Sequence, residues 1–106
     1  EALDILQPDI YWAGGLSEVI KIANIATTAD LITIPHGHST NAGIHFSLSQ
    51  SPIHTPYQEY LIKWNLVHQH FLKTPVIPIN GTIKIPNHNG LGMIIDENKV
   101  EEVKIF

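Results

Sequence analysis

The apolar positions of this chain fall into short continuous runs separated by one stripe with helical spacing. Residues 3–6 are mostly apolar and lead to Pro8, which disfavours helix at the residue before it, so we expect a strand that enters a turn. After a glycine pair, apolar residues recur three and four positions apart from Leu16 to Ala26. This spacing predicts an amphipathic helix that packs one face on a core.

The same order of elements is repeated once along the chain. Residues 31–34 are a second β-rich run that again ends at a proline, and residues 41–49 predict a short, largely buried helix. Residues 57–61 indicate a third short strand, and residues 63–72 are expected to be helical or irregular. Strand, polar loop and helix in alternation are typical of an α/β fold with parallel strands.

The last part of the chain predicts peripheral strands. Residues 81–85 and 93–95 flank a turn-rich stretch, and residues 101–106 alternate like a half-buried strand. A complete (β/α)₈ barrel needs roughly 250 residues, so these 106 residues suffice for about three of its eight units. The chain begins at Glu1 without a methionine and inside an apolar run, so we expect it to be cut from a longer protein.

The composition argues against several classes of partner. The chain has six lysines, no arginine and ten acidic residues, and its net charge of −4 argues against nucleic acid. No apolar run approaches the roughly 20 residues that span a bilayer, so no membrane partner is expected. The absence of cysteine agrees with a reducing compartment, and a cytoplasmic location is the expectation.

Three side chains near the predicted strands are candidates for chemistry. Asp9 and His36 each follow a strand, and a carboxylate beside an imidazole fixes its tautomer and raises its basicity. They could equally be a turn-forming aspartate and a core histidine, and spacing alone does not decide. Glu59 lies in a largely apolar stretch, where a charge is costly unless it is paired or functional. It could hydrogen-bond an oxyanion, or occupy an exposed alternate position of an edge strand.

Two histidine pairs raise the question of a zinc site. Residues 36 and 38, and residues 68 and 70, are each spaced by two, which in a strand places both rings on one face. No cysteine or acidic partner stands at the spacing of structural zinc sites. We therefore interpret His68 and His70 as surface or interface residues beside Trp64 and Phe71.

Five stretches, residues 4–18, 34–39, 58–61, 81–83 and 90–93, together resemble one family, the mandelate racemase/muconate lactonizing enzymes of the enolase superfamily. Residues 4–18 resemble the sixth strand and helix of that barrel, residues 34–39 the end of the seventh strand, and residues 58–61 the eighth. Residues 81–83 and 90–93 resemble the segment that closes the barrel. Within this family, Pro35-His36-Gly37 followed by a polar residue resembles acid-sugar dehydratases, such as those of the rhamnonate type.

The resemblance implies an α/β fold. The chain would be the C-terminal portion, about strands 6 to 8, of a (β/α)₈ TIM-type barrel, followed by a segment that returns to an α+β capping domain. Residues 1–75 would then form the last βα units, and residues 76–106 the closing segment.

The resemblance also implies a reaction and a set of residues. Asp9 and His36 would be the family's catalytic dyad, and Glu59 would hydrogen-bond the enolate side of the substrate. The remaining site residues would bind substrate: Trp12, His38 and Ser39. The reaction would remove the proton α to a carboxylate and eliminate the β-hydroxyl to give a 2-keto-3-deoxy acid. Mg²⁺ is the implied cofactor, with its ligands on earlier strands outside this chain.

Two alternatives remain open at this stage. A racemase, epimerase or cycloisomerase of the same superfamily would use the same dyad without eliminating water. The chain could instead be a non-catalytic fragment. For the dehydratase interpretation, the expected partners are an acid sugar, the remaining N-terminal part of the enzyme and further copies in a homo-oligomer. The isolated chain is expected to be inactive, and to self-associate through exposed apolar surface.

Overall fold

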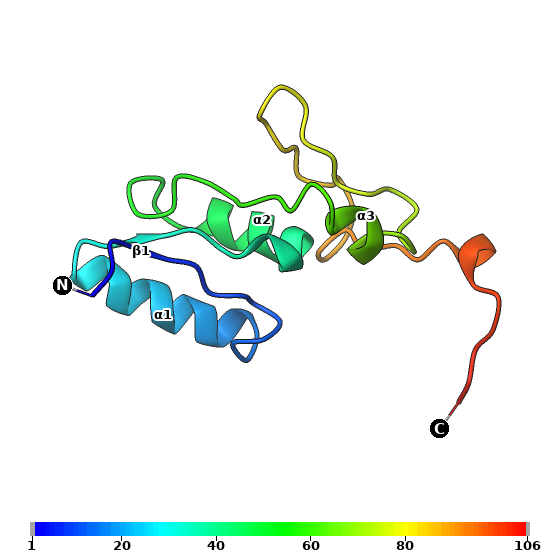
Figure 1. The fold of residues 1–106 in the computed structure, drawn as a ribbon, viewed down its shortest axis with the longest axis horizontal. Helices are drawn as coiled ribbons and strands as arrows, with labels where there is room; N and C mark the ends of the chain where they lie inside the picture. The colour runs from blue at the N-terminus through cyan, green and yellow to red at the C-terminus, as the bar shows by residue number, and fades with distance from the viewer. Residues whose placement is uncertain (1, 106) are drawn as a thin grey trace.

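A parallel pair of strands and two helices form the first half of the computed structural model, which describes residues 2–105 (Figure 1). In chain order the elements are β1 (Ile5–Leu6), α1 (Leu16–Thr28), β2 (Ile32–Thr33), the 3₁₀ helix η1 (Gly37–Ser39), α2 (Thr40–Ser49), α3 (Asn65–His68) and the 3₁₀ helix η2 (Glu97–Lys99).

The two strands run parallel and place two chain segments side by side beyond their own ends. Ile5 pairs with Ile32 and Leu6 with Thr33. The backbone hydrogen bonds then continue, because Ile34 N donates to Leu6 O at 2.9 Å and His36 N donates to Pro8 O at 3.0 Å. The predicted parallel α/β order is therefore confirmed. Its extension to a barrel stays a prediction.

Helix α1 confirms the predicted helical stripe and runs two residues beyond it, to Thr28. Val19, Ala23 and Ala26 are buried, as their spacing requires. Ile20 belongs to the predicted stripe but is 41% exposed, so the buried face is narrower than the pattern indicated. Gly15 precedes the helix with φ near 93°, a backbone conformation that side chains with a Cβ rarely adopt.

The core lies between α1, α2 and the loop after β1. Its buried members are Ile10, Val19, Ala23, Ala42 and Phe46. Helix α2 spans the predicted range and buries most of its first two turns, from Thr40 to Ile44 together with Phe46. The predicted buried helix is confirmed.

The predicted third strand is wrong, although the chain from His54 to Gln58 does lie alongside residues 33–35. Thr33 N donates to His54 O at 2.7 Å, and the Gln58 side chain donates to Pro35 O at 3.2 Å. A regular ladder does not form because Pro35 and Pro56 both lack the N–H that alternate ladder positions require. Of residues 63–72, four form the short helix α3.

The predicted peripheral strands are also wrong within the described residues. Only two isolated antiparallel bridges form there, Ile79 with Thr82 and Leu72 with Ile95. Residues 101–105 contain no strand, and residue 106 lies outside the described part. Among residues 2–105, these apolar segments have no neighbouring strand to complete a sheet.

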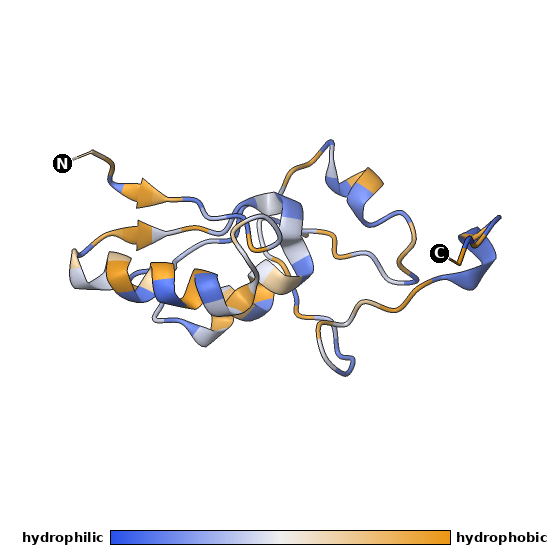
Figure 2. Cartoon of the chain, turned by 90° about the horizontal axis from the view of Figure 1, so that it is seen from below, coloured by the Kyte–Doolittle hydropathy of each residue, from blue (hydrophilic) through white to orange (hydrophobic). Residues whose placement is uncertain are grey.

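The shape of the molecule agrees with this lack of partners. The radius of gyration is 15.1 Å, whereas a closed domain of this length would have about 13 Å. Figure 1 shows the two ends of the chain at opposite sides and the C-terminal segment leading away from the helices. Figure 2 shows apolar residues along this segment as well as along β1 and α1. None of the described helices has both the length and the apolar character required to cross a membrane.

Candidate active site

Asp9 is held by the turn that follows it. Its Oδ1 accepts hydrogen bonds from the backbone N–H groups of Tyr11 at 2.9 Å and Trp12 at 3.3 Å. The carbonyl of Asp9 accepts from Ala13 N at 2.8 Å, so three hydrogen bonds hold the turn that follows the carboxylate. The side chain is only 15% exposed, and its second oxygen, Oδ2, remains for other partners.

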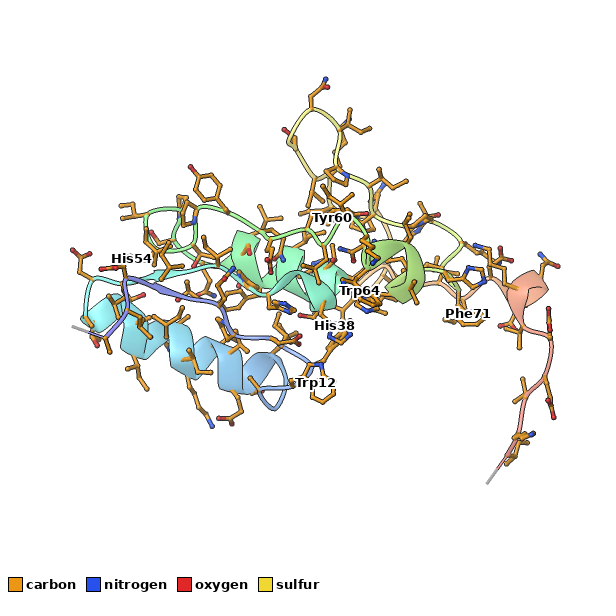
Figure 3. The ribbon with its side chains drawn as sticks, in the orientation of Figure 1. Trp12, His38, His54, Tyr60, Trp64 and Phe71 are labelled. Carbon is orange, nitrogen blue, oxygen red and sulfur yellow. The ribbon has the colours of Figure 1, made fainter. Side chains whose placement is uncertain are left out.

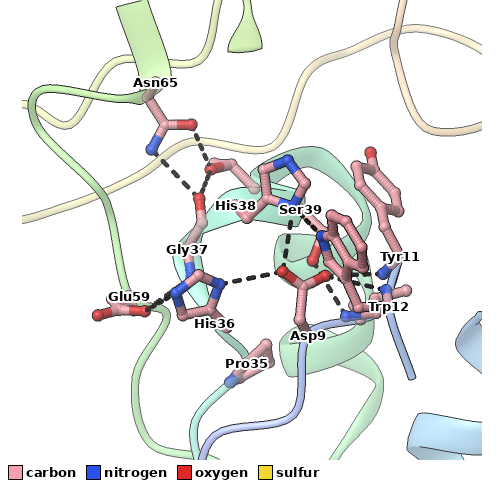
Figure 4. A network of polar contacts seen from close by, with 12 residues as sticks. Asp9, Tyr11, Trp12, Pro35, His36, Gly37, His38, Ser39, Glu59 and Asn65 are labelled. Carbon is pink, nitrogen blue, oxygen red and sulfur yellow. Dashed lines mark hydrogen bonds and ion pairs between the residues drawn. The ribbon is translucent and has the colours of Figure 1, made fainter.

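His36 lies between two carboxylates, as Figure 4 shows. Its Nδ1 is 3.0 Å from Asp9 Oδ2, and its Nε2 is 3.9 Å from Glu59 Oε2. Because an ionised carboxylate only accepts hydrogen bonds, Nδ1 must carry a proton toward Asp9. Nε2 is therefore the ring nitrogen that can give or take a proton on the open side.

Glu59 reaches this site through a close approach of two backbones. Its Oε2 accepts a hydrogen bond from Gly37 N at 2.8 Å. A Cβ added to Gly37 would lie 2.9 Å from the Glu59 carbonyl oxygen and 3.0 Å from Leu61. Glycine at position 37 is thus the condition for Glu59 to stand next to His36.

His38 adds a second imidazole to the same carboxylate. Its Nδ1 is 3.1 Å from Asp9 Oδ2, the oxygen that His36 also contacts. The indole N–H of Trp12 points at the same His38 Nδ1, again at 3.1 Å (Figure 4). Asp9 therefore contacts two imidazole nitrogens and two backbone N–H groups.

The other two predicted substrate-binding residues differ in their exposure. Trp12 is 81% exposed, and its ring stands at the open side of the site. Ser39 is fully buried, and its hydroxyl accepts the backbone N–H of Ile10 at 3.3 Å. Ser39 therefore ties the residue after Asp9 to η1 and faces away from the pocket.

His68 lies on the surface beside Trp64, as the sequence interpretation expected, and it also belongs to the site. Its ring stacks on Trp64 at 6.4 Å, and its centroid is 4.2 Å from that of His38. The contact with His38 is the part that the sequence analysis missed, because no local spacing relates positions 38 and 68. His70 packs edge-on against Phe71 at 4.9 Å, as its surface interpretation expected.

These side chains enclose an open pocket of about 420 Å³. Its lining residues are Asp9, Trp12, His36, His38, Leu61, Trp64 and His68. Figure 3 shows Trp12, His38 and Trp64 gathered in one place, with His54 far from them. His54 forms its own pair with Asp30 at 3.2 Å, and it does not line this pocket.

Electrostatics keep the pocket anionic at Asp9. Partial burial raises the pKa of Asp9, but the hydrogen bonds from His36, Tyr11, His38 and Trp12 outweigh it and lower that pKa below its ordinary value. Desolvation and the charge of Asp9 raise the pKa of Tyr11. Desolvation and the proximity of His38 lower the pKa of His68, which favours its neutral ring near pH 7.

No set of three or more histidine, cysteine, aspartate or glutamate side chains within residues 2–105 converges to hold a metal ion. The zinc interpretation of the two histidine pairs therefore finds no support in these residues. What the arrangement can do by itself is proton transfer, because one imidazole nitrogen is anchored on a carboxylate while the other faces a pocket and a second carboxylate.

Comparison with known proteins relates the whole chain to one family. A family described as enolase C-terminal domain-like matches residues 1–99. No solved structure matches the chain significantly.

Three curated relatives illustrate the similarity. D-galactarolactone cycloisomerase of Agrobacterium fabrum (strain C58) is 32% identical over 98% of this chain and 30% of its own length. Arabinonate dehydratase of Saccharolobus solfataricus is 32% identical over 97% of the chain and 28% of its length. A putative L-rhamnonate dehydratase of Caldivirga maquilingensis is 31% identical over 91% and 25%, respectively. The chain thus spans between a quarter and a third of each relative's length.

Proposed function

Because the chain belongs to the enolase C-terminal domain-like family, we propose that it supplies one side of the active site of an acid-sugar dehydratase. Two of its relatives carry the names of such dehydratases. The observation that carries the proposal is the position of His36, with Nδ1 on Asp9 at 3.0 Å and Nε2 toward Glu59 at 3.9 Å.

The proposed reaction removes the proton α to the substrate carboxylate and expels the β-hydroxyl as water, giving a 2-keto-3-deoxy acid. His36 donates the proton on Nε2 to the departing hydroxyl, and Asp9 stabilises the charged ring through Nδ1. The same nitrogen, once deprotonated, is suited to remove an α-proton. The carboxyl group of Glu59 hydrogen-bonds the oxygen on which negative charge develops.

Three further residues shape the pocket in this proposal. Trp12 and His38 line it, and Trp12 is the more exposed of the two. Ser39 acts from behind, because its hydroxyl holds the backbone of Ile10 next to Asp9.

Mg²⁺ would supply the stabilisation that a dianionic intermediate needs. The residues described here do not form a site for it, so we propose that its ligands come from other strands of the enzyme. This chain's own residues then contribute the proton transfers.

The exposed apolar residues support a larger assembly. Ile62, Leu66 and Ile25 are more than two-thirds exposed, although such side chains favour burial. We propose that the rest of the enzyme covers them, that the complete protein forms homo-oligomers, and that the isolated chain has no dehydratase activity.

The test uses the complete polypeptide that contains these residues. It is incubated with a panel of acid sugars, and formation of a 2-keto acid is followed. The variant His36→Asn should lower kcat by roughly 10²- to 10⁴-fold, the range of general acid–base catalysis. His54→Asn is the matched control, because His54 also pairs with an aspartate but lies outside the pocket. A panel that yields no 2-keto acid would refute the proposal.

Cycloisomerisation is the second candidate, since one relative at 32% identity is named a cycloisomerase. It predicts conversion of a lactone to an isomer with no 2-keto acid released. Exchange of the α-proton with solvent and no other product would instead indicate racemisation or epimerisation. If the complete protein converts none of the substrates, the remaining interpretation is that these residues belong to a non-catalytic protein.

A further inference from the structure

We propose that His38 is a positioning residue that holds Asp9 in place for His36. This role differs from the substrate contact that the resemblance implied for His38. The proposal rests on the function proposed above. It assigns a role to the second imidazole at Asp9.

The first argument is that both rings contact one oxygen. His36 Nδ1 and His38 Nδ1 lie 3.0 and 3.1 Å from Asp9 Oδ2. The two backbone N–H groups of Tyr11 and Trp12 contact the other oxygen. With donors on both oxygens the carboxylate cannot rotate without breaking a bond, so its Oδ2 stays directed at His36. Without His38, one side of Oδ2 would lose its partner.

The second argument concerns the proton on His38. Its Nδ1 lies 3.1 Å from the indole N–H of Trp12, which can only donate, and 3.1 Å from the Asp9 carboxylate, which can only accept. One nitrogen cannot serve both. A hydrogen bond to a charged acceptor is about twice as strong as a neutral one, so Nδ1 carries the proton and donates it to Asp9. The Trp12 N–H is then left for solvent or substrate.

The third argument is that the ring of His38 is fixed by its neighbours. Tyr11 lies edge-on at 5.6 Å, and His68 lies edge-on at 4.2 Å between ring centroids. The titratable groups that face His38 are Asp9 and Tyr11 from the loop after β1, His36 from the end of β2, and His68 from α3. Since Tyr11 and His68 are neutral near pH 7, the anionic group that faces the ring is Asp9.

The exposures of His38 and Trp12 agree with this division of roles. The His38 side chain is 26% exposed, whereas Trp12 is 81% exposed. Trp12 is thus available to a ligand, while the donor atom of His38 is already occupied by the protein.

The test compares two variants of the complete enzyme. His38→Phe keeps a ring in the same space without a donor, and His38→Asn returns an amide N–H close to the position of Nδ1. We expect His38→Phe to lower kcat roughly ten- to a hundredfold, the range for a lost hydrogen bond to a charged group, with KM changed less than about threefold. The acid limb of the kcat pH profile should move to higher pH, because Asp9 then interacts with His36 alone. His38→Asn should restore most of kcat and the original profile.

The opposite result, in which KM changes and kcat does not, would overturn the proposal. A His38→Phe variant with unchanged kcat and a raised KM would show that His38 binds substrate. Failure of His38→Asn to restore the pH profile would also count against it. Thermal unfolding shows whether both variants fold. If one does not, the NMR measurement described next, made on the unmodified enzyme, tests the proposal.

Nitrogen-15 NMR of the imidazole rings tests the geometry without any reaction. Two histidines should be protonated at Nδ1 and hydrogen-bonded to a carboxylate, and through-bond correlation of the rings to their backbone amides should assign them as His36 and His38. Asp9→Asn should weaken both signals. A His38 ring protonated at Nε2, accepting the Trp12 N–H, would refute the proposal. If both rings show the expected form but no acid sugar is dehydrated, the proposed function fails and the positioning role stands.

Discussion

Residues 5–49 and residues 73–105 both contain runs of branched apolar residues, yet only the first region builds a core. In residues 5–49, β1 pairs with β2, and Val19 of α1 and Phe46 of α2 belong to one buried core. In residues 73–105, Val76 is the buried large apolar residue, while Ile77, Ile79, Val103 and Ile105 are all more than half exposed. An apolar segment therefore folds only where the segments that it packs against are present.

The candidate site follows the same division. Asp9, His36 and His38 stand on the region that has its own core, so their geometry is supported by this chain alone. Residues 73–105 line none of the pocket around His36. The following predictions test how far the two regions differ, from the largest expected effect to the smallest.

Hydrogen exchange should separate the two regions most strongly. The amides of Val19 and Ala23 in α1 should exchange only through openings that cost several kcal/mol, whereas those of residues 101–105 should exchange with almost no protection. The ratio of protection factors should be roughly 10³ or more. Nearly uniform protection along the chain would contradict the comparison.

Truncation of one apolar side chain in each region gives the next largest effect. Phe46→Ala should lower the free energy of unfolding by about 3–5 kcal/mol, because Phe46 is 2% exposed and contacts the core. Ile79→Ala is the control, since Ile79 is 66% exposed and should change stability by less than about 0.5 kcal/mol. Urea unfolding of the chain measures both. Equal losses would mean that the C-terminal region is packed after all.

Two glycines of the first region allow a finer comparison. Gly37→Ala places a methyl group against the backbone at Glu59, which cannot move without displacing that residue, and should cost about 1–3 kcal/mol. Gly43→Ala meets only the side chain of Gln58, which can swing away, and should cost less. Thermal unfolding measures the two changes. The comparison would be wrong if Gly43→Ala were the more harmful of the two.

Lowering the pH should have the smallest effect on the free energy of unfolding. The pKa of Asp9 is lower in the folded chain than in the unfolded one, so Asp9 adds stability above about pH 4, its unfolded value, and loses it as the pH falls through the folded value. Asp9→Asn should therefore remove part of the acid dependence of unfolding, as measured by urea midpoints between pH 2 and 6. Glu102→Gln on the exposed tail is the matched control and should leave that dependence unchanged.

Much of the first region could be predicted from the sequence. The helical spacing from Leu16 to Ala26 gave α1, and the two runs that end at prolines gave a parallel pair. The strands expected at residues 57–61, 81–85 and 93–95 were wrong. Alternation predicts a strand only where a partner offers free N–H and C=O groups, and here prolines or missing neighbours remove the partner.

For the site, local sequence determined which groups are available, and tertiary contacts decided how they meet. The positions of Asp9 and His36 after successive strands follow from the order of elements, because parallel strands bring their ends together. That Glu59 reaches His36 depends on the absence of a side chain at Gly37, and that His38 shares Asp9 depends on the turn of η1. The approach of His68 to His38 depends on how α3 packs. Such contacts join residues more than 20 positions apart, and their distances are decided by backbone approach and ring orientation, which no local pattern of hydrophobic and polar residues contains.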